Sequence, residues 1–457
     1  MRYRYRSEEE LKDSGVEWIG KIPKDWEVGK FKYSSLLYTG NSIKDNEKDN
    51  YTDSESSYPY ISTKDINIDY NTINYDNGMY TKVDDKTFKI ANKDSILICI
   101  EGGSAGRKIS YLNQNVSFVN KLCCIQSSKV NSKFQYYYCN SDSFKKEFSL
   151  NMSGLIGGVS VSALNNFRLV NPSLFEQEKI ANFLDEKTSQ FDLIISKKEK
   201  LIERLEEAKK SLISEVVTGK VKVVKTDDGY GLVKRSSEEM KNSGVEWLGE
   251  IPKDWEVKRL RFLGKLQNGI SKSSDSFGYG YPFVSYSNVY RNIELPQIVE
   301  GLVNSTEEER KIYSVEEGDV LFTRTSETVE EIGFASTCMK TIYNSTFAGF
   351  LIRFRPNYKG LYKGFYKYYF RCDLNRKYFV KEMNLVTRAS LSQNLLNNLS
   401  VVLPKYEEQV EIYNALELKV SYINLSINKL KYQIEKLKEA KQSLISEAVT
   451  GKIEILD

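Results

Sequence analysis

Histidine is absent from the sequence, and several common kinds of functional site are excluded with it. Without imidazole the chain cannot form a Ser-His-Asp triad, a Cys-His pair, an HExxH motif or a zinc site with a histidine ligand. Its six cysteines include no C-x-x-C pair, so we expect reduced thiols buried in strands. No apolar run reaches the roughly 18 residues that a membrane helix needs. The basic start, MRYRYRSEEE, has no apolar core behind it, so we expect a cytoplasmic protein without a secretory signal.

Length and charge permit a DNA-binding protein but do not establish one. The 457 residues are too many for one ordinary domain, and 40% of them are hydrophobic, enough for two or three cores. Residues 29–171 hold 17 Lys and Arg against 14 Asp and Glu, a balance of +3. Residues 258–403 hold 20 against 14, a balance of +6. Such mildly basic segments suit a phosphate backbone, but many cytosolic proteins share this charge.

The chain contains two copies of one internal repeat. SGVEWIGKIPKDWEV (14–28) recurs as SGVEWLGEIPKDWEV (243–257), and EAKKSLISEVVTGK (207–220) recurs as EAKQSLISEAVTGK (439–452). Between these constant ends the two copies have diverged strongly. A constant frame around a variable insert predicts two modules of one fold that recognise two different things; the alternative is drift in two equivalent structural domains.

Short anchors survive in the divergent middles. YPYISTKDI (58–66) resembles YPFVSYSNV (281–289), and KDSILICI (93–100) resembles GDVLFTRT (318–325). Both anchors are rich in β-branched and aromatic residues and end in polar segments, which is typical of short strands followed by loops. We therefore predict a mixed α/β fold for each module.

Each copy ends in a long helix. From 173 to 216 no Gly or Pro occurs, Ser173 and Glu176 fit a capping box, and Gly219 follows the last apolar residue. Apolar residues recur in heptads, the mark of a coiled coil; Lys198 interrupts the first seam at the position where the second copy has Leu430. Roughly 44 residues give a rod of about 65 Å. We expect the two helices to pair antiparallel within one chain, in a pseudo-two-fold arrangement; the alternative is dimerisation between chains.

These patterns predict five segments and a seam. The segments are a first module at 1–172, a first long helix at 173–218, a linker at 219–234, a second module at 235–403 and a second long helix at 404–450. The predicted seam consists of Leu184, Phe191, Ile195, Ile202, Leu205, Leu212, Leu416, Ile423, Ile427, Leu430, Ile434, Leu437 and Leu444.

The first copy contains, in order, GVEWIGKIPKDWEV, a variable segment, NPSLFEQEKIANFLDEKTSQFD with its long helix, and SLISEVVTGKV. The second copy repeats this order of parts. The repeated order resembles the specificity subunit of type I restriction–modification systems. The resemblance covers essentially the whole chain. It implies two α/β target-recognition domains, each reading half of a split, asymmetric sequence in double-stranded DNA. It also implies an antiparallel coiled coil that sets the spacer and docks DNA methyltransferase subunits, two of them by the symmetry. S-adenosylmethionine would be bound by those subunits, and ATP and Mg by restriction and translocase partners, with no cofactor, metal or membrane bound by this chain.

We predict no catalytic residue in the chain. NPSL (171–174) faintly resembles the motif of amino-methyltransferases, but its counterpart LPKY (403–406) lacks the amide, and proline is favoured where a helix begins. EGGSAGRK (101–108) lacks the spacing of a phosphate-binding loop, and SETVEEIG in the second copy has no glycine cradle. We interpret these segments as a helix start and a turn or DNA-facing loop.

Base reading needs Arg, Lys, Asn or Gln on exposed loops, and phosphate contacts need Lys, Arg and hydroxyls. The segments after the anchor strands supply such residues, and Arg388 in LVTRASLS has its counterpart in LIGGVSVS (155–162). For each of them a solvated charge or local ion pair is an equally good explanation. The candidates for DNA contact are Thr63, Lys64, Arg107, Lys108, Tyr286, Asn288, Arg291, Arg324, Thr325 and Arg388.

Two aromatic clusters, FQYYYC (134–139) and YKGLYKGFYKYYFR (358–371), the second with interleaved lysines, could be stacking platforms. The helical spacing of Tyr362, Phe365, Tyr366 and Tyr369 favours instead a core-facing helix with outward lysines in the second cluster. Two other classes of function stay open: a coiled-coil adaptor without a DNA role, and a sequence-specific transcription regulator. The regulator would need a helix-turn-helix, which the variable segments do not show.

Overall fold

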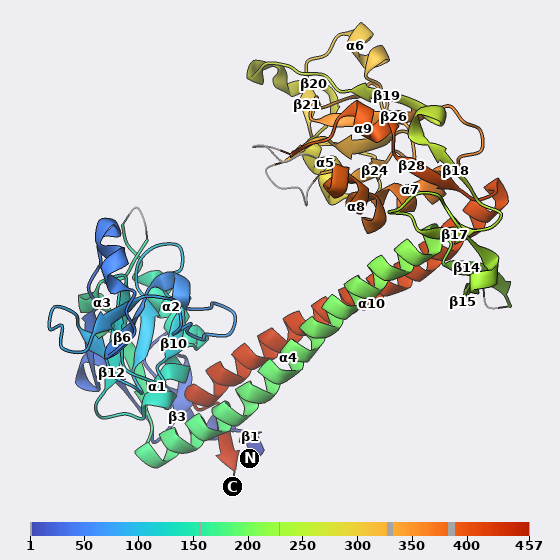
Figure 1. Cartoon of the computed structure of the whole chain (residues 1–457). Helices are drawn as coiled ribbons and strands as arrows, with labels where there is room; N and C mark the ends of the chain where they lie inside the picture. Colours follow the sequence, from blue (N-terminus) through green and yellow to red (C-terminus); the bar gives the residue numbers. More distant parts are fainter. Residues whose placement is uncertain (1, 155–156, 228, 327–331, 383–388, 457) are drawn as a thin grey trace. The chain divides into compact units, whose positions relative to one another are not determined.

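The computed structural model describes residues 2–154, 157–227, 229–326, 332–382 and 389–456. The chain divides into two units (Figure 1). The first consists of Met1–Lys200 and Leu430–Asp457, and the second of Leu201–Lys429. Each unit therefore contains one globular domain together with part of each long helix.

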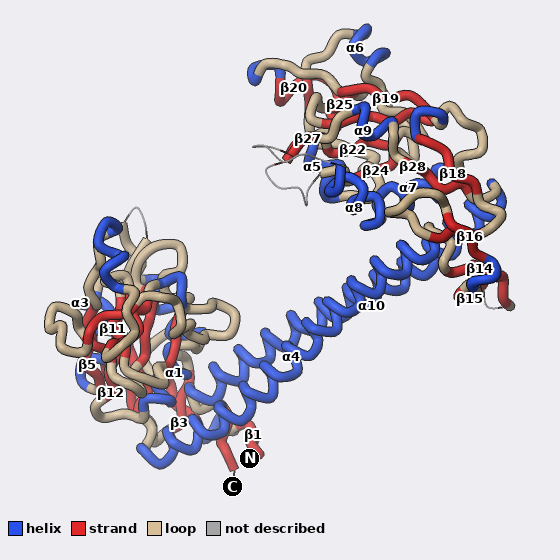
Figure 2. Tube along the Cα trace, viewed as in Figure 1, coloured by secondary structure: helices blue, strands red, loops and turns tan. Residues whose placement is uncertain are grey.

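The first unit is built on two small sheets (Figure 2). One is antiparallel, in the order β10 (Ile109–Tyr111), β9 (Ile96–Cys99), β12 (Leu122–Ser127) and β5 (Ser35–Thr39). The other is mixed, in the order β7 (Tyr80–Lys82), β6 (Ser57–Ile61), β11 (Val116–Phe118) and β8 (Ile90–Ala91), with β6 and β11 parallel. Shorter pairs join β2 (Leu11–Asp13) to β3 (Lys21–Pro23) and β4 (Glu27–Lys30) to β13 (Arg168–Asn171). Its helices are α1 (Ser132–Cys139), α2 (Asp142–Leu150) and α3 (Val161–Asn165).

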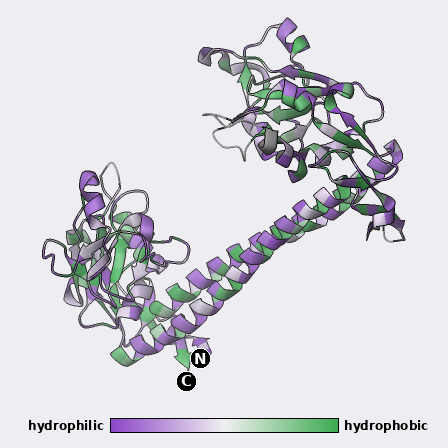
Figure 3. Ribbon diagram, viewed as in Figure 1, coloured by the Kyte–Doolittle hydropathy of each residue, from purple (hydrophilic) through white to green (hydrophobic). Residues whose placement is uncertain are grey.

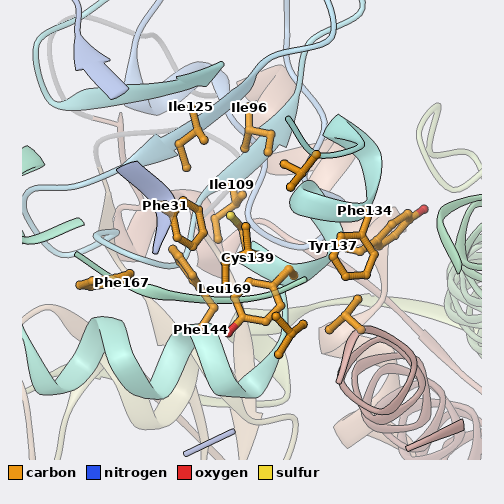
Figure 4. Close-up of a cluster of buried hydrophobic side chains, with 14 of the residues drawn as sticks. Phe31, Ile96, Ile109, Ile125, Phe134, Tyr137, Cys139, Phe144, Phe167 and Leu169 are labelled. Atoms are coloured by element: carbon orange, nitrogen blue, oxygen red, sulfur yellow. The ribbon is translucent and has the colours of Figure 1, made fainter. Parts of the chain in front are cut away.

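The core of the first unit lies between the antiparallel sheet and these helices (Figure 4). Ile96 and Ile125 come from neighbouring strands, and Phe134 and Phe144 come from α1 and α2. Residues near the start of the first long helix, such as Leu184, and near the end of the second, such as Val449, enter the same cluster. Burying these side chains drives the domain to fold onto the helices.

The second unit repeats this plan. Its antiparallel sheet has the order β19 (Gly264–Asn268), β26 (Leu351–Pro356), β22 (Val320–Thr323) and β24 (Ala335–Thr337). A second sheet joins β21 (Leu302–Val303), β20 (Phe277–Val284) and β25 (Thr346–Phe347), with β20 and β25 parallel. Short pairs join β16 (Met240–Asn242) to β17 (Glu250–Pro252), β18 (Glu256–Arg259) to β28 (Ser400–Leu403), and β23 (Thr325–Ser326) to β27 (Ala389–Ser390). Its helices are α5 (Tyr286–Arg291), α6 (Glu307–Ile312), α7 (Lys363–Arg371), α8 (Asp373–Glu382) and α9 (Gln393–Asn397).

The shared strand order confirms two domains of similar fold in spite of their divergent sequences. In both domains the variable segment begins and ends in one antiparallel ladder, β4 with β13 and β18 with β28. The two ladders have equivalent registers: Asn171 faces Glu27 in the first, and Leu403 faces Glu256 in the second. Each insert is thus closed at its base by the same piece of sheet.

The first long helix, α4 (Leu174–Val217), begins at a carboxylate that ties three segments together. Ser173 caps the helix, because its hydroxyl accepts from the backbone N–H of Glu176 at 3.3 Å. The Glu176 carboxylate accepts from the Arg6 guanidinium at 2.8 Å and from the Trp26 indole at 2.9 Å. The serine half of the predicted capping box is therefore present, but the Glu176 carboxylate contacts the constant N-terminal segment in place of the Ser173 backbone.

The second long helix, α10 (Tyr406–Val449), begins in the same way. Glu408 accepts from the Arg235 guanidinium at 2.7 Å and from the Trp255 indole at 3.0 Å. Burial raises the pKa of Glu408, and its indole and guanidinium partners oppose that rise. This shared contact explains why the Arg, Trp and Glu positions are identical in both copies.

The VTGK motif of each copy packs against the IPKDW motif of the other copy. Gly219, after α4, has φ +75°, and a Cβ there would lie 2.4 Å from Pro252 and 3.0 Å from Trp255 of the second copy. Gly451, after α10, has φ +71° and stands in the same relation to Pro23 and Trp26 of the first copy. Each domain is therefore held by the start of one long helix and the end of the other, and only glycine fits where that end turns.

The long helices pair antiparallel within the chain. In the first unit the Lys441 ammonium contacts Asp192 at 2.7 Å, and the seam residue Lys198 donates to Gln433 at 2.8 Å. In the second unit Lys209 donates to Asn424 at 3.1 Å. Every predicted seam residue is buried or half-buried, and the hydropathy colouring of both helices alternates accordingly (Figure 3). Each apolar stripe is covered by the other helix of the same chain, as the intramolecular prediction requires.

Two equivalent ribbons follow the helix ends. In the second unit β14 (Val221–Thr226) pairs with β15 (Gly229–Lys234). In the first unit β29 (Ile453–Leu456) pairs with β1 (Arg2–Tyr5), which is the opposite end of the chain. The pair of β1 and β29 in the first unit therefore corresponds to the hairpin of β14 and β15 in the second unit.

The second aromatic cluster is a core helix, as predicted, and the first lies in α1. In α7, Phe365, Tyr366 and Tyr369 are buried. The prediction of outward lysines fails at Lys367, which is 5% exposed and contacts Glu417 at 2.7 Å and Glu294 at 3.1 Å. Its ammonium is buried because two carboxylates pair with it. All six cysteines are buried and free, although only Cys99, Cys123 and Cys124 lie in strands; Cys139, Cys338 and Cys372 do not, because helix ends and loops also border the cores.

Across the described ranges, no helix combines the length and the apolar character that crossing a bilayer requires.

Replacing Glu408 by alanine should strand a buried guanidinium and an indole N–H. We expect the second unit to lose about 3 kcal/mol of stability, seen as a lower midpoint in calorimetry. The adjacent, exposed Glu407→Ala is the matched control and should change little. Equal midpoints for the two variants would show that the carboxylate does not hold the frame.

Glu147 predicts a pH dependence for the first unit. This carboxylate is 4% exposed, and burial raises its pKa to about 6, although the backbone N–H of Arg168 donates to both oxygens at 3.0 Å. The folded state holds the proton more tightly, so stability is fully present below about pH 4.5 and declines by about 2 kcal/mol as pH rises through 6. Glu147→Gln should remove this decline from the denaturation midpoints, whereas the exposed Glu178→Gln should retain it. A decline that persists in Glu147→Gln would assign it to another group.

Candidate nucleic-acid interface

The anchor strands β9 and β22 end at equivalent loops. In the first domain the backbone N–H of Ile100 donates to Lys121 at 3.0 Å, and in the second that of Arg324 donates to Phe350 at 3.0 Å. Ile100 also accepts from Val159 at 2.9 Å, and Arg324 from Leu391 at 2.7 Å. Arg324 and Ile100 are therefore structurally equivalent. This pairing is shifted by one residue from the alignment of the two anchor sequences. A one-residue slip matters because it exchanges the two faces of a strand.

A glycine closes the loop in both domains. The N–H of Gly106 donates to Cys99 at 2.8 Å, and that of Gly333 donates to Thr323 at 3.1 Å. Both glycines have positive φ, and a Cβ would collide with Phe148 or Phe379 of the helix behind. The second copy thus does keep one glycine of the segment 101–108, and its role is to let the loop lie close to the helix.

The four candidates of the first domain lie in the segments that follow its anchor strands β6 and β9. Thr63 and Lys64 form a helical turn after β6, and Lys64 is exposed. The Lys108 ammonium donates to the backbone carbonyl of Thr63 at 2.6 Å, which links the two anchor loops. Arg107 is exposed and makes a 3.5 Å contact with Gly103. Two of the four, Lys64 and Arg107, present charge to solvent.

Three candidates of the second domain lie on α5 instead of in a loop. Asn288 completes a capping box with the N-cap residue Ser285, because its side-chain oxygen accepts from the Ser285 backbone N–H at 2.9 Å and hydroxyl at 2.8 Å. Tyr286 stacks on Tyr290 with ring centroids 6.1 Å apart, and Arg291 is exposed at the helix end. Ser-x-x-Asn after the strand was the signal for this cap.

The remaining candidates follow β22. Arg324 is half-buried, and Thr325 pairs with Ser390 between β23 and β27. In the first domain the bridge between Glu101 and Gly158 occupies the same place. Arg388 lies outside the described residues. Contact of these ten residues with DNA remains a prediction.

The NPSL segment has a structural role. Gln177 donates to the carbonyl of Pro172 at 2.8 Å and accepts from the N–H of Asn131 at 2.8 Å. Gln409 does the same with Pro404 and Tyr362, both at 2.9 Å. Among the described residues, no group of three or more Cys, Asp or Glu is gathered as metal ligands would be.

Sequence comparison identifies the family. The family described as the type I restriction modification DNA specificity domain matches residues 23–206 and 252–436. The specificity subunit of the type I restriction enzyme EcoKI of Escherichia coli K12 is 22% identical over 95% of this chain and 90% of its own length. The putative MjaX specificity subunit of Methanocaldococcus jannaschii is 24% identical over 96% of both chains.

A solved structure shares the fold. One chain in the structure of complex assembly and conformational transition of the type I R-M system superimposes with a TM-score of 0.69. That alignment covers 94% of this chain and 99% of the other at 14% identity. The match of the family to both copies, over more than half of the sequence, places the chain in the type I restriction–modification DNA specificity family, as a specificity subunit with two recognition domains.

Proposed function

We propose that this chain selects the DNA sequence on which a type I complex acts, with each recognition domain reading one half of a bipartite, asymmetric site. The observation that carries this is the repeat: two copies of the specificity domain share one frame, while the inserts that the frame holds differ. Specificity subunits carry no chemistry of their own, so catalysis belongs to other subunits of the complex.

The edge that carries the anchor loops is our candidate for the DNA-reading surface. It presents Lys64 and Arg107 in the first domain and Arg291 and Arg324 in the second. Arginine and lysine are the side chains that pair with guanine edges and phosphates. The remaining candidates are expected to place these residues or to contact phosphates.

We propose that the helix pair sets the unread spacer and docks two methyltransferase subunits. The C-terminal ends of the two helices, 207–220 and 439–452, are nearly identical, whereas segments that read different bases would vary. Leu193 on α4 is 56% exposed, and Leu425, the same position of the repeat on α10, is 64% exposed. Both lie outside the seam, so each copy offers an equivalent apolar contact. S-adenosylmethionine is expected on those subunits, and ATP and Mg on restriction and translocase partners.

Arg324→Ala should weaken duplex binding by the complex of this chain with its methyltransferase. We expect the binding free energy for the preferred duplex to weaken by about 1–3 kcal/mol, because water does not replace the hydrogen bonds of a guanidinium to a base. Only the sequence preference in the second half-site should change. Fluorescence anisotropy with duplexes altered in either half measures this. Lys311→Ala on α6 is the control. Binding of the wild-type complex that is equal for all sequences would contradict the proposed function itself.

Leu193→Asp and Leu425→Asp should each remove one methyltransferase subunit, because a charge replaces an exposed apolar contact without entering the seam. Native mass spectrometry of the purified complex should show one subunit lost from either single variant and both from the double variant. Ser421→Asp, also exposed on α10, should keep both subunits. Full assembly of the double variant would place the docking surface elsewhere.

A further inference from the structure

A tight turn beside the anchor loop has the same backbone in both domains. In the second domain the N–H of Leu351 donates to Ala348 at 2.9 Å, and in the first that of Leu122 donates to Val119 at 3.0 Å. The turns 348–351 and 119–122 precede the central strands β26 and β12. No sequence motif marks this equivalence, and the turn was not among the predicted contacts.

The turn of the second domain is held from three sides. Ala348 donates to Val284 at 3.0 Å, and Gly349 donates to Ile270 at 2.7 Å. Phe350 accepts from the N–H of Arg324 at 3.0 Å. A Cβ on Gly349 would lie 2.4 Å from the Ser271 hydroxyl, so this position suits glycine. The backbone that carries Phe350 is therefore fixed by its neighbours.

The ring of Phe350 nevertheless lies in solvent, with 65% of the residue exposed. A single exposed apolar residue is ordinary on a protein surface. Phe350 differs because its backbone is fixed and directly bonded to Arg324, the candidate base reader. An apolar side chain on a fixed backbone, next to an arginine, combines the two kinds of group that read base edges in the major groove, where phenylalanine contacts the thymine methyl.

The first domain keeps the turn and changes what it presents. Lys121 stands at the position of Phe350 and is exposed, and the buried Ile100 stands at the position of Arg324. Val119 donates to Ile61 at 3.0 Å, as Ala348 does to Val284. A fixed backbone with different exposed side chains is what two readers of different half-sites require.

We propose that Phe350 is a specificity residue of the second recognition domain, making an apolar contact with a thymine methyl next to the base that Arg324 reads. Lys121 makes the corresponding charged contact in the first domain. This inference rests on the proposed function and goes further, because it assigns one base chemistry to one side chain. Replacing the exposed ring should leave the fold unchanged.

The test selects bound duplexes from a randomised pool, using the complex of this chain with its methyltransferase. Wild type should yield a bipartite motif. F350A should lose preference at one or two adjacent positions of the second half and bind the wild-type site about tenfold more weakly, whereas F350L should retain most of the preference. K121A should affect the first half alone. Equal thermal midpoints of the variants confirm that folding is unchanged.

Deoxyuridine identifies the contact atom. Replacing thymidine by deoxyuridine, one position at a time, removes only the methyl group and should weaken wild-type binding about fourfold at a single position of the second half. F350A should be insensitive to that replacement. A motif identical in F350A and wild type, or an equal loss with every sequence, would overturn the proposal for Phe350. A wild-type complex without any motif would instead overturn the proposed function.

Discussion

The carboxylate at the start of each long helix is the contact on which the architecture depends. Glu176 and Glu408 each accept from a tryptophan and an arginine that lie far away in sequence. The glycine that ends the opposite helix packs under the same tryptophan, so one small site joins both helices to a recognition domain. Three segments must therefore stay constant together, while the insert between them is free to change. This physical coupling explains the repeat better than independent drift does.

The division between frame and insert also explains how the chain can serve recognition. The insert starts and ends in one short ladder, so its loops can change without disturbing the helix contacts. Loops on a rigid scaffold are where binding specificity usually resides. In this family the chain chooses a sequence and leaves reaction chemistry to partners, which agrees with the absence of histidine and with the structural use of Gln177 and Gln409.

The sequence predicted the parts that depend on periodicity and repetition. Heptads, the Ser173 cap and Gly219 located the long helices, and the aromatic spacing located α7. It could not locate contacts that depend on tertiary packing. Lys367 is buried because two carboxylates meet it, and Asn288 turns back to cap α5. The equivalence of Arg324 with Ile100, and of Phe350 with Lys121, rests on hydrogen bonds between segments distant in sequence.

The most direct test replaces the first insert, residues 29–171, by the second, residues 258–403, between the two equivalent ladders. If the two recognition domains read DNA independently, sequencing of duplexes bound by the resulting methyltransferase complex should give a symmetric motif. Both halves of that motif should have the sequence of the second half-site. An unchanged asymmetric motif, or loss of all preference from a chain that remains folded, would contradict the account.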